Sequence, residues 1–194
     1  MKQITFIRHG KVDIENIQRI KSSFLPQWVD TYNSAPLHPE SLPSHITIKY
    51  AAEAEMIITS RLRRAIDSAK ILGVRINEKN ALFNEASVPH VDIPFLKLKP
   101  KSWLLLLRLL LLAGVGKKDT SLKASKSQAK KAAERLSELS LKYDHIVLIG
   151  HGGMNWLICK VLLKEGWIPE GKGSHENWGV TVLKLPTSAS SSCS

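Results

Sequence analysis

Two histidines, one near each end of the chain, follow short apolar runs and are each followed by glycine. The first stands in Arg8-His9-Gly10 and the second in Gly150-His151-Gly152-Gly153. The apolar runs before them, residues 4–7 and 146–149, are typical of strands buried on both faces. In an open α/β sheet the carboxyl ends of the strands form the ligand crevice. The sequence therefore predicts one anion-handling site built from both ends of the chain.

The length and composition fit one domain with a substantial core. The chain has 194 residues, of which 43% are hydrophobic, and this size suits a single folded unit. We predict that residues 1–186 form this domain. The Ser-rich segment 187–194 is predicted to be a disordered tail, either native or left over from expression.

Positive charge is concentrated in one part of the chain. The formal net charge is +11, and between Lys97 and Lys142 twelve Lys and Arg residues stand against three acids, giving that segment +9. One interpretation is attraction of anionic partners such as phosphorylated substrates, nucleic acid or an acidic surface. The other is a solvated helix face with its loops. Because no nucleic-acid-binding motif with interleaved aromatics accompanies the lysines, we expect no nucleic-acid partner.

Cysteine content and hydropathy place the protein in a reducing compartment. The two cysteines, Cys159 and Cys193, do not indicate a disulfide framework, and the N-terminus is too short and polar to be a signal peptide. The most apolar stretch, residues 103–112, is interrupted by Arg108 and is well short of the ~20 residues of a membrane span. It predicts a buried or partly covered helix, with a partner-binding or membrane-surface helix as the alternative, and Trp103 with the leucines is either core or a dimer face. We expect a cytoplasmic protein without a membrane span and leave the oligomeric state open.

Patterns typical of strands and helices alternate along the chain. The apolar runs predict strands at residues 2–7, 55–59, 74–76, 145–149 and 180–185. The helical periodicity predicts helices at residues 61–72, capped by Ser60, and at 103–112, 121–142 and 155–163. Residues 12–43, rich in proline, and 81–98 are predicted to be loops. This order predicts an α/β fold, a three-layer α/β/α sandwich with a mostly parallel central sheet.

Four separated segments resemble the histidine phosphatase superfamily, also called phosphoglycerate-mutase-like, and they span nearly the whole chain. Arg8-His9-Gly10 is similar to the N-terminal RHG signature, and Ile149-Gly150-His151-Gly152-Gly153 to the C-terminal histidine signature. Glu85, in Leu82-Phe83-Asn84-Glu85, falls where the family places its acid loop. The strand–helix segment of the family, ending Arg-Ala-x-x-Ser/Thr-Ala, resembles Thr59-Ser60-Arg61-Leu62-Arg63-Arg64-Ala65-Ile66-Asp67-Ser68-Ala69.

The resemblance implies a phosphoric monoester hydrolase of the histidine acid phosphatase type. His9 would attack phosphorus and form a phosphohistidine that water later hydrolyses. Glu85 would protonate the leaving alkoxide and then deprotonate the attacking water. Arg8, Arg64 and a protonated His151 would hold the phosphoryl oxygens, because phosphoryl transfer depends on positioning and on cancelling negative charge.

Further phosphate contacts are expected from the main chain and from the loop after His9. The N–H groups near Gly10 and Gly152 are candidates, since glycine lets the backbone approach closely. Arg19 stands at the family's offset from His9, and Asn16 stands one residue later than the family position. Both are predicted to bind substrate, with solvated loop residues as the alternative interpretation.

We expect neither a metal nor a cofactor, and the expected partner is a phosphorylated small molecule whose identity the sequence does not encode. Three further histidines show no metal-ligand spacing with a carboxylate: His38, His45 and His90. Lys11 stands where the family commonly has an acidic residue or glutamine, and residues 12–43 do not match the mutase pattern, which favours hydrolysis. The alternatives are a phosphoglycerate-type mutase, a phosphoprotein or phosphohistidine phosphatase, and a catalytically idle phosphate-binding scaffold.

Overall fold

The computed structural model describes residues 1–14, 18–86, 93, 95–112 and 120–186. The predicted tail, residues 187–194, lies outside the described residues. No helix among those described is long and apolar enough to cross a membrane.

A six-stranded sheet forms the centre of the molecule, with strand order β4-β3-β6-β1-β8-β7. Strands β4, β3, β6 and β1 run parallel to one another, whereas β8 is antiparallel to β1 and β7 is antiparallel to β8. The prediction of a mostly parallel sheet is therefore confirmed. The strand bounds are β1 Lys2–Arg8, β3 Met56–Thr59, β4 Glu78–Lys79, β6 His145–Gly150, β7 Ile168–Pro169 and β8 Val180–Leu185.

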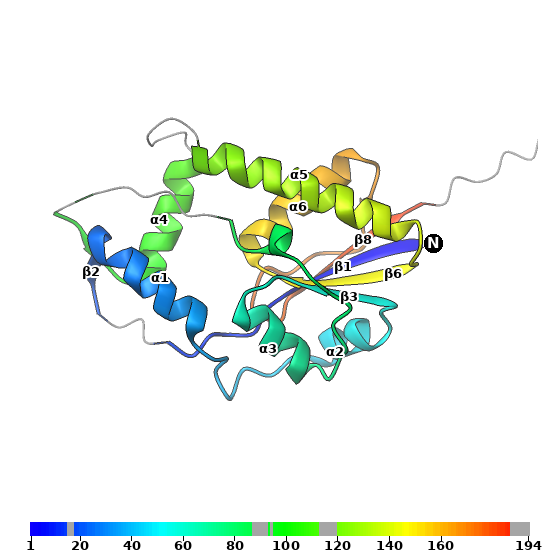
Figure 1. Ribbon diagram of the computed structural model, residues 1–194, viewed down its shortest axis with the longest axis horizontal. Helices are drawn as coiled ribbons and strands as arrows, with labels where there is room; N and C mark the ends of the chain where they lie inside the picture. The colour runs from blue at the N-terminus through cyan, green and yellow to red at the C-terminus, as the bar shows by residue number, and fades with distance from the viewer. Residues whose placement is uncertain (15–17, 87–92, 94, 113–119, 187–194) are drawn as a thin grey trace, which may run out of the picture.

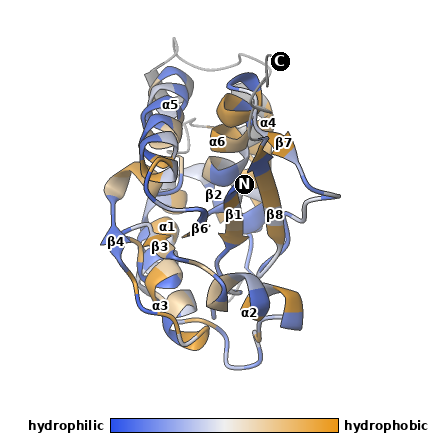
Figure 2. Cartoon of the chain, turned by 90° about the vertical axis from the view of Figure 1, so that its right-hand side faces the viewer, coloured by the Kyte–Doolittle hydropathy of each residue, from blue (hydrophilic) through white to orange (hydrophobic). Residues whose placement is uncertain are grey.

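Helices cover both faces of the sheet, as the predicted three-layer sandwich requires (Figure 1). On one face lie α5 (Thr120–Ser140) and α6 (Gly152–Lys164), and on the other lie α2 (His45–Ala52) and α3 (Arg63–Ile71). Successive side chains of a strand point to opposite faces, so the apolar runs feed both layers, and Figure 2 shows hydrophobic strands between the helices. In β1, Ile4 and Phe6 pack in the α5/α6 layer, and Ile7 packs in the α2/α3 layer.

A smaller unit lies beyond the carboxyl ends of the parallel strands (Figure 1). It contains α1 (Leu25–Ser34), α4 (Pro100–Leu112) and a two-stranded ladder of β2 (Ile20–Lys21) with β5 (Lys97–Leu98). Short 3-10 helices occupy Ser22–Phe24 and Ala81–Phe83. The buried centre of this unit is made by three large side chains from α1 and α4: Leu25, Trp103 and Leu107.

Two secondary-structure predictions were wrong for identifiable reasons. The segment predicted as a proline-broken loop contains α1, because Pro26 falls in the first turn, where the missing N–H leaves no bond unmade. No strand forms at the predicted residues 74–76, because the apolar side chains of Val74 and Ile76 pack against the α2/α3 layer from an irregular segment. The strand β4 begins two residues later.

The leucine-rich helix α4 is partly covered, as predicted. Trp103 and Leu107 are 0% and 1% exposed, whereas Leu105 and Leu109 are 59% and 55% exposed. One side of the helix therefore completes the core of the small unit while another side faces outward.

Candidate active site

The carboxyl ends of β1 and β6 bring the two signature histidines together. The strands pair so that Arg8 lies opposite Gly150, which places His9 and His151 one residue beyond the same edge of the sheet. Their ring centroids are 5.1 Å apart, with the ring planes inclined by 57°. Both side chains are buried, with exposures of 2% and 0%.

The hydrogen bond made by one ring nitrogen of His9 determines the state of the other. Nδ1 lies 2.7 Å from the carbonyl oxygen of Gly10. Because a carbonyl only accepts, Nδ1 carries the proton and Nε2 of the neutral ring carries a lone pair. Burial lowers the pKa of His9 from 6.5 to about 3, with the nearby positive charges of Arg64 and Arg8 adding to this effect and the Gly10 hydrogen bond opposing it. The imidazole is therefore neutral over the physiological range, with Nε2 unprotonated.

Arg64, in the first turn of α3, links the two histidines. Its Nε–H donates to His9 Nε2 and to His151 Nδ1, each at 3.2 Å. Since a guanidinium only donates, Nδ1 of His151 is an acceptor and the ring proton lies on Nε2. That nitrogen is 2.7 Å from Ser60 Oγ, at the end of β3. The unprotonated nitrogens of both imidazoles thus face the same cation.

Main-chain contacts hold the segment around His9 in place. The Gly10 N–H donates to Ser68 Oγ at 2.9 Å, and Asn177 Nδ2 donates to the His9 carbonyl at 2.9 Å. Trp178 packs directly over Gly10, where a β-carbon would lie 2.6 Å from the indole ring. A glycine is required here because no other residue leaves room for that close approach.

Glu85 reaches the N-terminus of α6, the helix that begins just after His151. Its Oε1 accepts from the main-chain N–H groups of Met154 and Ala86, both at 3.2 Å, which fixes the carboxyl group beside the first turn of α6. Gly153 makes this approach possible, since a β-carbon there would lie 2.8 Å from Oε1. Gln128 of α5 donates to two carbonyls of the same loop, at 2.9 and 3.1 Å. The acid is thereby tied to the helix layer rather than to the sheet.

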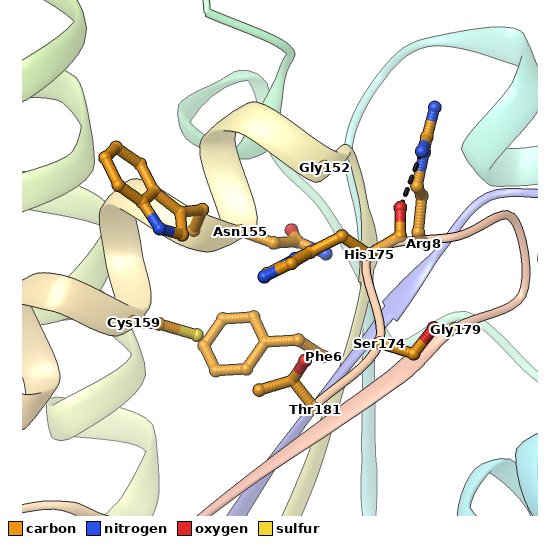
Figure 3. A pocket seen from close by; sticks show the side chains of 10 residues that line it. Phe6, Arg8, Gly152, Asn155, Cys159, Ser174, His175, Gly179 and Thr181 are labelled. Atoms are coloured by element: carbon orange, nitrogen blue, oxygen red, sulfur yellow. Dashed lines mark hydrogen bonds between the residues drawn. The ribbon is translucent and has the colours of Figure 1, made fainter. Parts of the chain in front are cut away.

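Arg8 is oriented differently from Arg64. Its Nη1 donates to the His175 carbonyl at 2.6 Å (Figure 3), and its buried Nε has no hydrogen-bond partner among the described atoms. Arg8 and nine other residues line a cavity of about 10 Å³, which is close to the size of one water. Burial raises the pKa of the Cys159 thiol in this cavity to about 12, so the thiol stays protonated.

Three further residues were predicted to bind phosphate or substrate: Asn16, Arg19 and Gly152. Asn16 lies outside the described residues. Arg19 is exposed, and no hydrogen bond or ion pair joins it to the described part of the chain. Gly152 is the first residue of α6. Over the same described ranges, no three His, Cys, Asp or Glu side chains gather as a metal site would require.

Several side chains that contact the central group were missed by the sequence analysis. Ser60 was predicted to cap α3, but Leu62 occupies the cap position, and Ser60 contacts His151 instead. Two residues of α1 contact Arg64: Asn33 by a hydrogen bond and Tyr32 by its ring face. The signal for Ser60 was its place at the end of a strand adjacent to the histidine strands. No sequence signal marked Tyr32 and Asn33, because they lie about thirty residues from Arg64 in a segment predicted to be a loop.

No protein-family model matches the chain, and no curated protein matches its sequence. Solved structures do resemble it. A phosphoglycerate mutase from Bacillus anthracis superposes with a TM-score of 0.59 at 15% identity, covering 95% of this chain and 88% of that one. Phosphoserine phosphatase from Entamoeba histolytica in complex with 3-phosphoglyceric acid gives a TM-score of 0.57 at 16% identity, covering 94% and 90%. A putative alpha-ribazole-5'-P phosphatase from Escherichia coli gives 0.51 at 15% identity, covering 82% and 79%.

These likenesses extend over most of both chains, although the sequences have diverged widely. The chain therefore shares the fold of this phosphoglycerate mutase and of these phosphatases.

Proposed function

We propose that the protein is a metal-independent phosphomonoesterase that forms a phosphohistidine on His9, with Glu85 as general acid and base. The observation that carries the proposal is the state of His9. Its Nδ1 proton is held by Gly10, and its lowered pKa leaves the Nε2 lone pair available. The fold, which this chain shares with phosphatases and a mutase, supports phosphoryl transfer as the reaction class.

In the first step, Nε2 of His9 attacks phosphorus, and the bond from phosphorus to the ester oxygen breaks. Arg64 lies beside Nε2, and its Nε–H would pass from the imidazole nitrogens to a phosphoryl oxygen when substrate binds, while its outer side stays against α1. His151 would be protonated on Nδ1, and this N–H would donate a hydrogen bond to a phosphoryl oxygen. Its Nε2–H would stay hydrogen-bonded to Ser60. Glu85 would deliver its proton to the leaving alkoxide.

In the second step, the Glu85 carboxylate takes a proton from water as that water attacks the phosphohistidine. The bond between phosphorus and Nε2 breaks, inorganic phosphate leaves, and His9 regains its lone pair. The anchoring of Glu85 at the N-terminus of α6, beside the His151 segment, supports this pairing of roles.

Hydrolysis of p-nitrophenyl phosphate with EDTA present, at mildly acid to neutral pH, tests the proposal. We expect turnover by the wild type and a loss of at least about 10⁴-fold in kcat for His9→Ala, since removing a nucleophile eliminates the covalent route. His38→Ala, which removes an imidazole outside the site, should keep full activity. Undiminished turnover by a folded His9→Ala protein would overturn the mechanism, and a strict need for a divalent ion would overturn its metal-independent part.

A phosphoglycerate-type mutase is the second candidate, since a phosphoglycerate mutase shares the fold. In that case His9 would pass its phosphoryl group to a substrate hydroxyl rather than to water. A coupled mutase assay run at the same enzyme concentration as the phosphatase assay distinguishes the two, because the faster reaction identifies the acceptor.

A further inference from the structure

The end of α1 reaches into the histidine cluster and contacts the outer side of Arg64. Asn33 Oδ1 accepts a hydrogen bond from Arg64 Nη1 at 2.7 Å. The Tyr32 ring lies against the guanidinium, with Arg64 Cζ 4.8 Å from the ring centroid, within the range of a cation–π contact. Arg64 therefore contacts the two histidines through Nε. It contacts α1 through Nη1 and through one face of the guanidinium.

α1 is itself held by contacts that do not involve the sheet. Trp28 stacks on Tyr32 with ring centroids 5.2 Å apart. Leu25, near the start of the helix, packs with Trp103 and Leu107 of α4. The Trp103 indole N–H also donates to the Ile20 carbonyl at 2.7 Å. The small unit thus gives α1 a fixed position from which to hold a side chain of the main domain.

A second arginine of α3 strengthens the connection. Arg63 Nη1 donates to the Ser34 carbonyl at the last residue of α1, and Arg63 Nε pairs with Asp67 on its own helix at 3.1 Å. The start of α3 is therefore joined to the end of α1 through two successive residues, one directed to the main chain and one to a side chain.

We propose that Asn33, together with the ring of Tyr32, is a positioning residue that orients the Arg64 guanidinium for the phosphoryl group. This inference rests on the proposed function, because it assigns the phosphoryl group to Arg64. A guanidinium recognises phosphate through donors in a fixed planar fork, so its plane must be set as well as its place. Asn33 sets that plane from one end, Tyr32 supports one face, and the 3% exposure of Arg64 shows how closely it is enclosed.

Binding of inorganic phosphate, measured by isothermal titration calorimetry, tests the inference directly. We expect Asn33→Ala to weaken phosphate binding about tenfold, the effect of losing one hydrogen bond to a charged group. The inhibition constant for phosphate in p-nitrophenyl phosphate hydrolysis should rise by the same factor, while the unfolding temperature stays close to that of the wild type.

Two matched controls separate orientation of Arg64 from a general effect on α1. Ser34→Ala changes the next residue, whose hydroxyl donates to two carbonyls of its own helix, and it should bind phosphate as the wild type does. Tyr32→Phe keeps the ring and should also be unchanged, whereas Tyr32→Leu removes it and should weaken binding.

The outcomes also separate this inference from the proposed function. If the wild type hydrolyses phosphate esters and folded Asn33→Ala binds phosphate equally or more tightly, the positioning role is wrong and the phosphatase stands. If the wild type neither binds phosphate nor turns over esters, the proposed function fails and this inference fails with it.

Discussion

The two halves of the candidate site are held by different parts of the molecule. His9, His151 and Arg64 are buried and bonded to one another at the edge of the sheet. Glu85 is half-buried on a loop, and its Oε1 accepts from the main-chain N–H groups of Ala86, next to it in the loop, and of Met154, in the first turn of α6. The difference teaches that strand ends hold the two histidines and helices α1 and α3 hold Arg64, whereas a loop and the start of α6 hold Glu85. Under the proposed mechanism, variation in the loop that carries Glu85 would change how the leaving group is protonated without moving His9.

Among the changes that test this division, removal of the Glu85 carboxyl group should produce the largest effect. We expect Glu85→Gln to lower kcat by about 10²- to 10⁴-fold on an alkyl phosphate, the usual contribution of general acid–base catalysis. The loss should be much smaller on p-nitrophenyl phosphate, because nitrophenolate leaves without being protonated. The measurement is kcat for both substrates in the same preparation, expressed as the ratio of kcat on the alkyl phosphate to kcat on p-nitrophenyl phosphate.

Glu78→Gln is the matched control, since that carboxylate pairs with Arg135 at 2.8 Å outside the site. It should leave the ratio unchanged. An equal loss on both substrates in Glu85→Gln would mean that Glu85 acts on the phosphoryl side, and the two halves would not be separate.

We expect a smaller effect on kcat from a change at Ser60, which contacts His151. Ser60→Ala removes the acceptor for the Nε2–H of buried His151, and an unsatisfied buried donor costs about 1–3 kcal/mol. We expect kcat to fall about tenfold, and the alkaline limb of its pH profile to move to lower pH because the charged ring loses an acceptor. Ser125→Ala, a buried serine whose hydroxyl has no hydrogen-bond partner among the described atoms, is the control. An unchanged profile in Ser60→Ala would remove Ser60 from the site.

The smallest expected effect is a change in the free energy of unfolding that depends on His9 alone. Burial lowers the pKa of His9 from its ordinary value of 6.5 to about 3 in the folded state. Below 6.5 the unfolded chain binds a proton that the folded protein does not, so His9 lowers stability as the pH falls from 6.5 towards 3. This amounts to about 1.4 kcal/mol between pH 7.5 and 5.5.

Urea unfolding of the wild type and His9→Gln at the two pH values isolates this contribution. The difference in unfolding free energy between the pH values should be smaller in His9→Gln by that amount. His145, whose pKa is also lowered by burial, is present in both proteins and cancels. Equal pH dependence in the two proteins would show that His9 titrates normally and is not held neutral by the fold.

The sequence predicted those parts of the candidate site in which a polar side chain stands next to a regular pattern of a strand or a helix. The apolar runs before His9 and His151 identified the central strands, and the strand–helix segment around Arg64 identified the third part of the site. It was uninformative where position depends on packing between distant elements. Nothing near Asn33 shows that α1 will lie against Arg64, because the small unit around Trp103 determines that contact. The orientation of Arg8 towards His175 depends likewise on a loop more than 160 residues away in the chain.

The place of β1 in the sheet has a consequence for how the protein is made. β1 lies between β6 and β8, so both of its hydrogen-bonding neighbours come from the last third of the chain, and Gln3 pairs with a residue 142 positions later. During synthesis β1 is made first, and both of its edges stay unpaired until β6 and β8 have been made. Such long-range pairing folds slowly and leaves apolar edges exposed to other chains in the interval. Truncations that remove β8 are therefore expected to leave β1 paired with β6 on one edge and unpaired on the other.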